Sequence, residues 1–299
     1  MVLLLLAGLT SAGLLGALLI GIRSYLEERA DYVRTPPTDL SSHPERTGIP
    51  GLHEVSFVSP DGTRIGGWYV PPVNRAAVVL VHGTGADRTG VLAEIRLLAA
   101  AGFGALALDV PGQGVSGGQT RWGVPESHAI SAAVDWLAAR REVDPARIGG
   151  FGLSMGAYVM ARAAATDQRL SAVVLASCPS DVVEQNWRAS NRFGLLSQIP
   201  TYWALRAAGQ ALDMKPRDVA GAIAPRPLLI IGGELDTLVP AGMSRQIYAA
   251  AHEPKELWIV PGAHHTDFPV QAPQEYPRRL IGFYSRALLR PAIPRASSF

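Results

Sequence analysis

Ser154 stands in a five-residue pattern that suits a nucleophile, Gly152-Leu153-Ser154-Met155-Gly156. The apolar run 147–153 before it predicts a buried strand, and residues 155–165 have the composition of a helix. A serine on such a sharp strand-to-helix turn exposes its hydroxyl, and side chains two residues to either side would collide there. The helix that follows directs backbone N–H groups, that of Met155 first, toward a developing oxyanion. The pattern therefore predicts Ser154 as a nucleophile for acyl transfer.

A nucleophilic serine needs a general base, and the base needs an acid that orients it. The apolar run 227–233 is followed by Glu234 and Asp236, and the run 256–260 is followed by His264 and His265. Parallel sheets place reactive groups in the loops at the carboxyl ends of their strands. Asp236 is the better acid by position, and Glu234 is the alternative. The two histidines cannot both face the serine, so the base is one of them.

A second oxyanion donor is expected in the segment Val81-His82-Gly83-Thr84-Gly85, which follows a long apolar run. We assign the backbone N–H of Thr84, which would face that of Met155. The alternative is an ordinary glycine-rich turn between a strand and a helix. Phosphate binding is not indicated, because the segment lacks the G-x-x-x-x-G-K-[ST] pattern.

The elements that position these residues alternate between strands and helices from Leu52 onward, which predicts an α/β fold with a mostly parallel sheet and helices on both faces. Residues 53–70 predict two antiparallel strands that turn at Pro60-Asp61-Gly62. Further strands are expected at 76–83, 104–110, 147–153, 171–177, 227–233 and 256–260, and helices at 90–101, 126–141, 155–165, 241–251 and 273–288.

Residues 179–222 interrupt this alternation and are expected to form a small helical cap or lid insertion. Their scattered aromatic and aliphatic residues suit a wall that binds an acyl chain. They suit equally well the packing of helices onto the core.

From about residue 53 to 288 the chain resembles the α/β-hydrolase superfamily, especially bacterial esterases and lysophospholipase-like or serine-aminopeptidase-like enzymes. The resemblance rests on LVHGTG (80–85), the D-x-P-G-x-G-x-S segment (109–116), GLSMG (152–156), GGELDTLVP (232–240) and PGAHHTD (261–267). It implies a catalytic triad of Ser154, Asp236 and His265, and it places Asp109 in a structural loop. Haloalkane dehalogenases and epoxide hydrolases carry Asp where this chain has Ser154, so the resemblance does not extend to them.

The N-terminal residues 2–22 contain no charge and are long enough to span a bilayer as a helix. We predict an uncleaved single-pass anchor, and a cleaved signal peptide, with export of the enzyme, is the alternative. Arginines at 23, 29 and 34 place the catalytic domain in the cytoplasm by the positive-inside rule. The predicted organisation is a membrane segment (1–22), a Pro- and Ser-rich linker (23–51), a hydrolase domain (52–290) and a tail (291–299).

Composition excludes several classes of function. The net charge of +2 and the absence of a basic run argue against nucleic-acid binding. The single cysteine, Cys178, permits neither an intrachain disulfide nor a thiolate metal cluster, and no cofactor is expected. The sequence therefore predicts a serine hydrolase of small-molecule or lipid-like carboxylic esters. A serine peptidase for short peptides and a catalytically silent, membrane-tethered binding protein are the alternatives.

Overall fold

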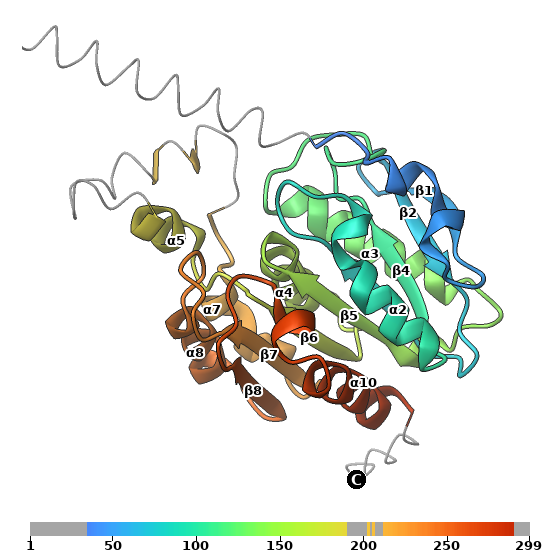
Figure 1. Ribbon diagram of the computed structural model, residues 1–299. Helices are drawn as coiled ribbons and strands as arrows, with labels where there is room; N and C mark the ends of the chain where they lie inside the picture. The colour runs from blue at the N-terminus through green and yellow to red at the C-terminus, as the bar shows by residue number, and fades with distance from the viewer. Residues whose placement is uncertain (1–34, 190–201, 204, 207–211, 290–299) are drawn as a thin grey trace, which may run out of the picture.

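The computed structural model describes residues 35–189, 202–203, 205–206 and 212–289 (Figure 1). The described chain begins its sheet with a hairpin of β1 (His53–Val58) and β2 (Arg64–Val70), which pair antiparallel. The Ser59 N–H donates to the Thr63 carbonyl at 2.9 Å and closes the turn between them. The predicted turn at Pro60-Asp61-Gly62 is thereby confirmed.

The remaining strands form the parallel part of an eight-stranded sheet. They are β3 (Ala77–Val81), β4 (Gly104–Leu108), β5 (Ile148–Leu153), β6 (Ala172–Ala176), β7 (Leu228–Gly233) and β8 (Lys255–Val260). The order across the sheet is β1-β2-β4-β3-β5-β6-β7-β8, and β2 joins the parallel part antiparallel to β4. Every residue of β3 to β7 is buried, which explains why these strands read as continuous apolar runs. The prediction of a mostly parallel sheet is confirmed.

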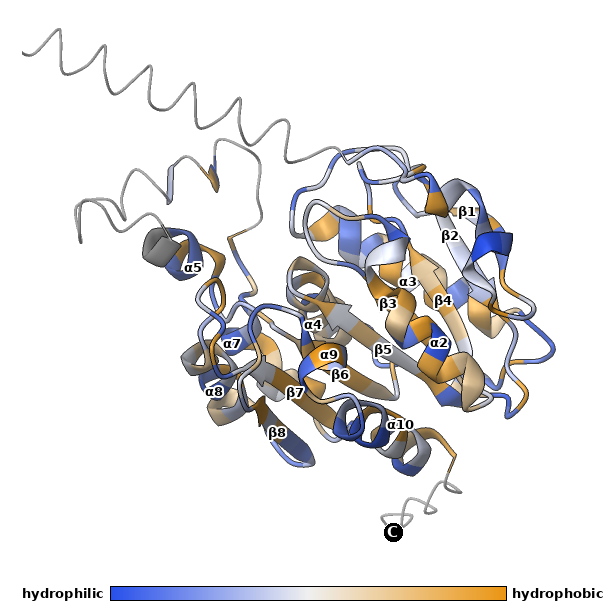
Figure 2. Ribbon diagram, viewed as in Figure 1, coloured by the Kyte–Doolittle hydropathy of each residue, from blue (hydrophilic) through white to orange (hydrophobic). Residues whose placement is uncertain are grey.

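Helices cover both faces of this sheet (Figure 1). The helices are α2 (Leu92–Ala100), α3 (Val124–Ala138), α4 (Met155–Thr166), α8 (Ala241–Ala250) and α10 (Glu275–Leu288). Successive strand side chains point to opposite faces, so Val79 packs in one core with α3, α4 and α8, and Leu80 packs in the other with α2 and α10. Figure 2 shows the apolar strands enclosed between these helices.

The insertion after β6 carries α5 (Val182–Ala189), α7 (Pro216–Val219) and the one-turn 3₁₀ helix η6 (Ala220–Ile223). Further 3₁₀ turns are η3 (Arg88–Val91) and η4 (Pro145–Arg147), and α9 (Phe268–Gln271) follows the loop after β8. Most of the predicted cap between residues 190 and 211 lies outside the described residues, so the expectation of a lid there stays a prediction.

Residues 35–51, expected to be part of a linker, are packed against the domain. They form η1 (Leu40–Ser42) and η2 (Pro44–Thr47). The backbone N–H and hydroxyl of Thr38 donate to Asp87 Oδ2 at 2.8 and 2.9 Å, and the Ser41 carbonyl accepts from Arg88 Nη2 at 3.2 Å. The described part of the predicted linker is therefore ordered, because distant buried charges bind its backbone.

Within the described ranges, no helix is both long and apolar enough to cross a bilayer. The predicted membrane segment 2–22 and the tail 291–299 lie outside the described residues.

Candidate active site

Ser154 lies in the turn between β5 and α4 with a left-handed backbone conformation, φ 55° and ψ −116°. Non-glycine residues rarely adopt this conformation, and such strain collects at functional sites. A Cβ on Gly152 would lie 2.4 Å from the Gly156 carbonyl oxygen, and one on Gly156 would lie 2.2 Å from the Val81 carbonyl oxygen. The two glycines of the motif are therefore required by close backbone packing around the serine.

Ser154, His265 and Asp236 form a continuous line of hydrogen bonds. His265 Nε2 lies 3.0 Å from Ser154 Oγ, and His265 Nδ1 lies 2.7 Å from Asp236 Oδ2. A carboxylate only accepts, so these partners assign the ring proton to Nδ1 and leave Nε2 to accept from the serine hydroxyl. The Asp236 side chain is fully buried and that of His265 is 25% exposed. The arrangement can remove a proton from the serine and hold the resulting imidazolium.

Asp236 is held in place by three further hydrogen bonds. Its Oδ1 accepts from the backbone N–H groups of Leu238 and Val239 at 2.9 and 2.8 Å, and its Oδ2 accepts from Ser177 Oγ at 3.3 Å. Ser177 follows β6 directly, and β6 pairs with β7, which leads into the Asp236 loop. Ser177 is not among the residues predicted from the sequence, although a polar residue directly after a buried strand is a signal that could have found it.

The two alternatives, Glu234 and His264, lie away from this line. Glu234 Oε2 accepts from the Gly262 N–H at 2.9 Å, so it ties the loop after β7 to the loop after β8. The His264 side chain is exposed, and its carbonyl packs against Gly233, where a Cβ would lie 2.5 Å from the carbonyl oxygen. The structure therefore brings Asp236 and His265 to the serine and gives Glu234 and His264 other positions.

The two predicted oxyanion donors lie in chain segments that approach Ser154. Met155 is the first residue of α4, where the helix dipole favours negative charge. Thr84 follows Gly83, which lies so near the serine that a Cβ on Gly83 would be 3.3 Å from Ser154 Cβ. Both residues thus belong to the segments that adjoin the nucleophile.

His82 fixes the loop that carries Thr84. Its Nδ1 lies 2.8 Å from the Gly83 carbonyl oxygen, and the Val110 N–H donates to its Nε2 at 3.4 Å. The ring is fully buried, and this burial lowers the pKa of His82 below its ordinary value. A neutral ring that donates through Nδ1 and accepts through Nε2 satisfies both partners.

Asp109 has a structural environment, as the resemblance implied. Its Oδ1 accepts from the Arg88 N–H at 2.8 Å and its Oδ2 accepts from the Val115 N–H at 2.9 Å. Arg88 Nη1 lies 3.7 Å from Oδ2, and both side chains are buried. The carboxylate thereby shapes the loop after β4.

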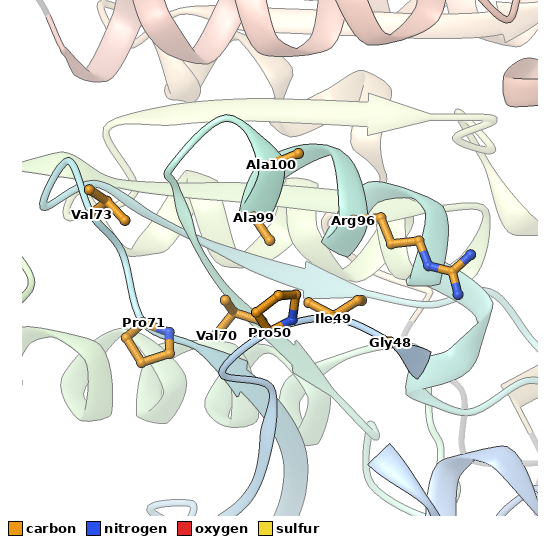
Figure 3. A pocket seen from close by; sticks show the side chains of 9 residues that line it. All are labelled: Gly48, Ile49, Pro50, Val70, Pro71, Val73, Arg96, Ala99 and Ala100. Carbon is orange, nitrogen blue, oxygen red and sulfur yellow. The ribbon is translucent and has the colours of Figure 1, made fainter. Parts of the chain in front are cut away.

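A cavity of about 410 Å³ lies far from the triad, between residues 48–50, the end of β2 and α2 (Figure 3). Because β2 runs antiparallel to β4, its last residue, Val70, lies at the amino ends of the parallel strands, opposite to Ser154. This cavity therefore takes no part in the chemistry of the triad. Among the described residues, no group of three or more His, Cys, Asp or Glu side chains is arranged to hold a metal ion.

The sheet order, the serine turn and the hydrogen-bonded line define a serine-type hydrolase of the α/β-hydrolase fold. Residues 27–226 match the X-Pro dipeptidyl-peptidase (S15) family, and the chain belongs to this family. The matched range contains Ser154 but ends before Asp236 and His265.

Two relatives show how far this similarity extends. An uncharacterized protein of Mycobacterium tuberculosis is 33% identical over 227 residues, which cover 73% of this chain and 74% of the relative. A solved structure of an esterase from Pyrococcus furiosus is 25% identical, with a TM-score of 0.73, and the match covers 86% of this chain and 98% of the esterase. The chain is therefore an enzyme of the hydrolase class.

Proposed function

We propose that the enzyme cleaves carboxylic esters through an acyl-enzyme on Ser154. The observation that carries this proposal is the line Ser154 Oγ, His265 Nε2, His265 Nδ1 and Asp236 Oδ2, with contacts of 3.0 and 2.7 Å. Such a line activates a hydroxyl that is otherwise a weak nucleophile at neutral pH.

The reaction follows from the positions of these groups. Ser154 Oγ attacks the ester carbonyl while His265 Nε2 takes its proton, and the N–H groups of Thr84 and Met155 stabilise the oxyanion. The imidazolium then gives the proton to the leaving alcohol. A water molecule, deprotonated by the same nitrogen, cleaves the acyl-enzyme and restores the serine. Asp236 stabilises the imidazolium in both halves of the reaction.

Ion pairs in the described part of the insertion support an ester over an N-terminal dipeptide as the substrate. An enzyme that removes dipeptides must bind a free amino terminus, for which carboxylates are the strongest partners. In the described part of the insertion, Asp181 already pairs with Arg217 and Lys215 at 2.7 and 2.8 Å, and Glu184 pairs with Arg217 at 2.9 Å. The similarity to the Pyrococcus furiosus esterase also supports ester cleavage.

A serine peptidase for short peptides is the second candidate, and the match to the X-Pro dipeptidyl-peptidase family favours it. A panel of p-nitrophenyl esters of increasing chain length, measured beside Gly-Pro and other aminoacyl p-nitroanilides, separates the two. We expect higher kcat/KM for the esters, with no turnover of either class by Ser154→Ala. Faster cleavage of Gly-Pro p-nitroanilide would instead assign the enzyme to the peptidases.

We also propose that residues 2–22 anchor the enzyme in a membrane with the catalytic domain on the cytoplasmic side. The uncharged length of the segment and the arginines at 23, 29 and 34 support this. The full-length protein should sediment with membranes and resist extraction by carbonate. A mature N-terminus between about residues 15 and 35 on sequencing would mean a cleaved signal peptide and an exported enzyme.

A further inference from the structure

Exposed apolar side chains gather at one edge of the sheet. Nine large apolar side chains are exposed among the described residues: seven lie in segments that follow the carboxyl ends of parallel strands, and an eighth, Val58, ends β1 at the same edge. Val73, which follows β2 at the opposite edge, is the exception. The edge with eight exposed apolar residues is the one that carries Ser154.

The strand directions and connections of the sheet place these residues at the Ser154 edge. Val58 ends β1, which runs in the direction of β4, and Val124 begins α3 after the loop that follows β4. Trp203, 61% exposed, belongs to the insertion after β6, and Leu238 follows β7. Val270, 75% exposed, lies on α9 after the β8 loop, and Figure 2 shows the orange colour of this helix. Apolar side chains from the end of β1 and from four separate connections thus lie at the edge of the sheet that carries Ser154.

The described chain begins at this same edge. The Thr35 carbonyl accepts from the Gly114 N–H at 2.8 Å, and the Thr35 N–H donates to Gln113 Oε1 at 3.2 Å. Both partners lie in the loop after β4, beside Val115. The described chain therefore begins at the Ser154 edge, and the predicted anchor ends, at Ile22, only a short distance before Thr35 in the sequence.

The short connection between the predicted anchor and Thr35 limits how the domain can be oriented on the membrane. Residues 23–34 span at most about 45 Å even when fully extended. A folded domain with as many residues as the hydrolase domain has a diameter of roughly 45–50 Å. The opposite edge would reach the bilayer only with the connection completely stretched, whereas the Ser154 edge reaches it with ample slack.

We propose that the Ser154 edge is a membrane-docking face, which rests on the bilayer that holds the anchor and takes ester substrates whose acyl chains lie in that bilayer. The inference rests on the proposed anchor and deepens the proposed ester hydrolase by naming the source of its substrate. Exposed apolar side chains around a site gain free energy when a lipid surface removes them from water.

Site-directed fluorescence on the full-length protein tests the docking. Single variants Val124→Cys, Trp203→Cys, Val270→Cys and, as the matched control, Val73→Cys are labelled with bimane and reconstituted in phosphatidylcholine vesicles. The native Cys178 is buried and does not compete for the label. Lipids with a nitroxide on the acyl chain should quench the first three labels and leave the label at position 73 unchanged.

Equal quenching at all four positions, quenching only at position 73, or no quenching would overturn the proposal. A spectral shift that grows with protein concentration, without quenching by the lipid nitroxide, would show that a second copy of the chain covers this face instead.

A kinetic comparison separates the docking from the chemistry. The triple variant Val124→Ser, Trp203→Ser, Val270→Ser should keep its activity on p-nitrophenyl acetate in water and lose activity on p-nitrophenyl palmitate presented in vesicles. Val73→Ser should keep both activities.

If neither ester is hydrolysed by the native enzyme but the quenching pattern appears, the proposed function fails and the docking stands. If both esters are hydrolysed equally by the triple variant and the native enzyme, the docking fails and the proposed function stands.

Discussion

Asp236 and His265 are joined by a contact of 2.7 Å between Oδ2 and Nδ1, although 29 residues separate them in the chain. Each follows a parallel strand, β7 or β8, and these strands are neighbours in the sheet. Adjacent parallel strands end at the same edge, so their loops meet there. The contact is thus a consequence of strand order.

Asp236→Asn should lower kcat by about 10⁴-fold, because an amide favours the ring tautomer that cannot accept the serine proton. Stopped assays on p-nitrophenyl butyrate measure kcat for the native enzyme and the variant. Glu234→Gln is the matched control, since it changes an acid two residues away that accepts from the Gly262 N–H and lies outside the triad. Equal losses in the two variants would show that the loop, and not the acid at 236, matters to turnover.

The tandem histidines should respond very differently to removal of the ring. His265→Ala should cost about 10⁴–10⁶ in kcat because it deletes the general base. His264→Ala should leave kcat nearly unchanged, since that ring is exposed. The same steady-state assay compares them, and the reverse ranking would contradict the assignment of the base.

Glu94 should make stability depend on pH. It is buried, the Tyr276 hydroxyl donates to its Oε1 at 2.6 Å, and burial raises the pKa of the carboxyl above its ordinary value of 4.5. The unfolded chain therefore releases this proton at lower pH than the folded one. The free energy of unfolding should fall as pH rises above 4.5 toward the folded-state pKa, by at most about 1.4 kcal/mol per pH unit.

Glu94→Gln should remove the contribution of Glu94 to this slope, because the amide oxygen still accepts from Tyr276 and does not titrate. Urea midpoints of the two proteins across this pH range provide the measurement. Parallel pH profiles for native and variant protein would mean that Glu94 contributes no linkage.

The packed segment 35–51 should contribute to stability. A chain that begins at residue 52 lacks Thr38 and Ser41, and it leaves the buried Asp87 and Arg88 without these partners. Since a hydrogen bond to a charged group contributes about 1.5–3 kcal/mol and three are lost, its free energy of unfolding should lie at least about 2 kcal/mol below that of a chain that begins at residue 35. Identical urea midpoints would show that the segment only covers the surface.

The sequence predicted most of the architecture because its signals are local. The buried runs that became β3 to β7 are continuous, and the turn at Pro60-Asp61-Gly62 marks the hairpin. Ser154 was recognisable because the strand, the glycines and the helix are contiguous with it. The order of the elements alone brought the loops of Asp236 and His265 to the same edge.

What the sequence did not predict depends on contacts between distant residues. Ser177 supports Asp236 across 59 positions, and Thr38 binds Asp87 across 49. Neither pair has a characteristic spacing, so composition assigned residues 35–50 to a linker. Local patterns also could not decide between the adjacent His264 and His265, because that choice depends on how the loop after β8 turns toward Ser154.

The central claim is that Ser154 forms a covalent bond with its substrate, and intact-mass measurement after reaction with a fluorophosphonate tests it most directly. We expect one adduct per chain, mapped to Ser154 by peptide sequencing, and none in Ser154→Ala or in protein that has been unfolded before reaction. An adduct on another residue, or the same labelling of Ser154→Ala as of the native enzyme, would contradict the account.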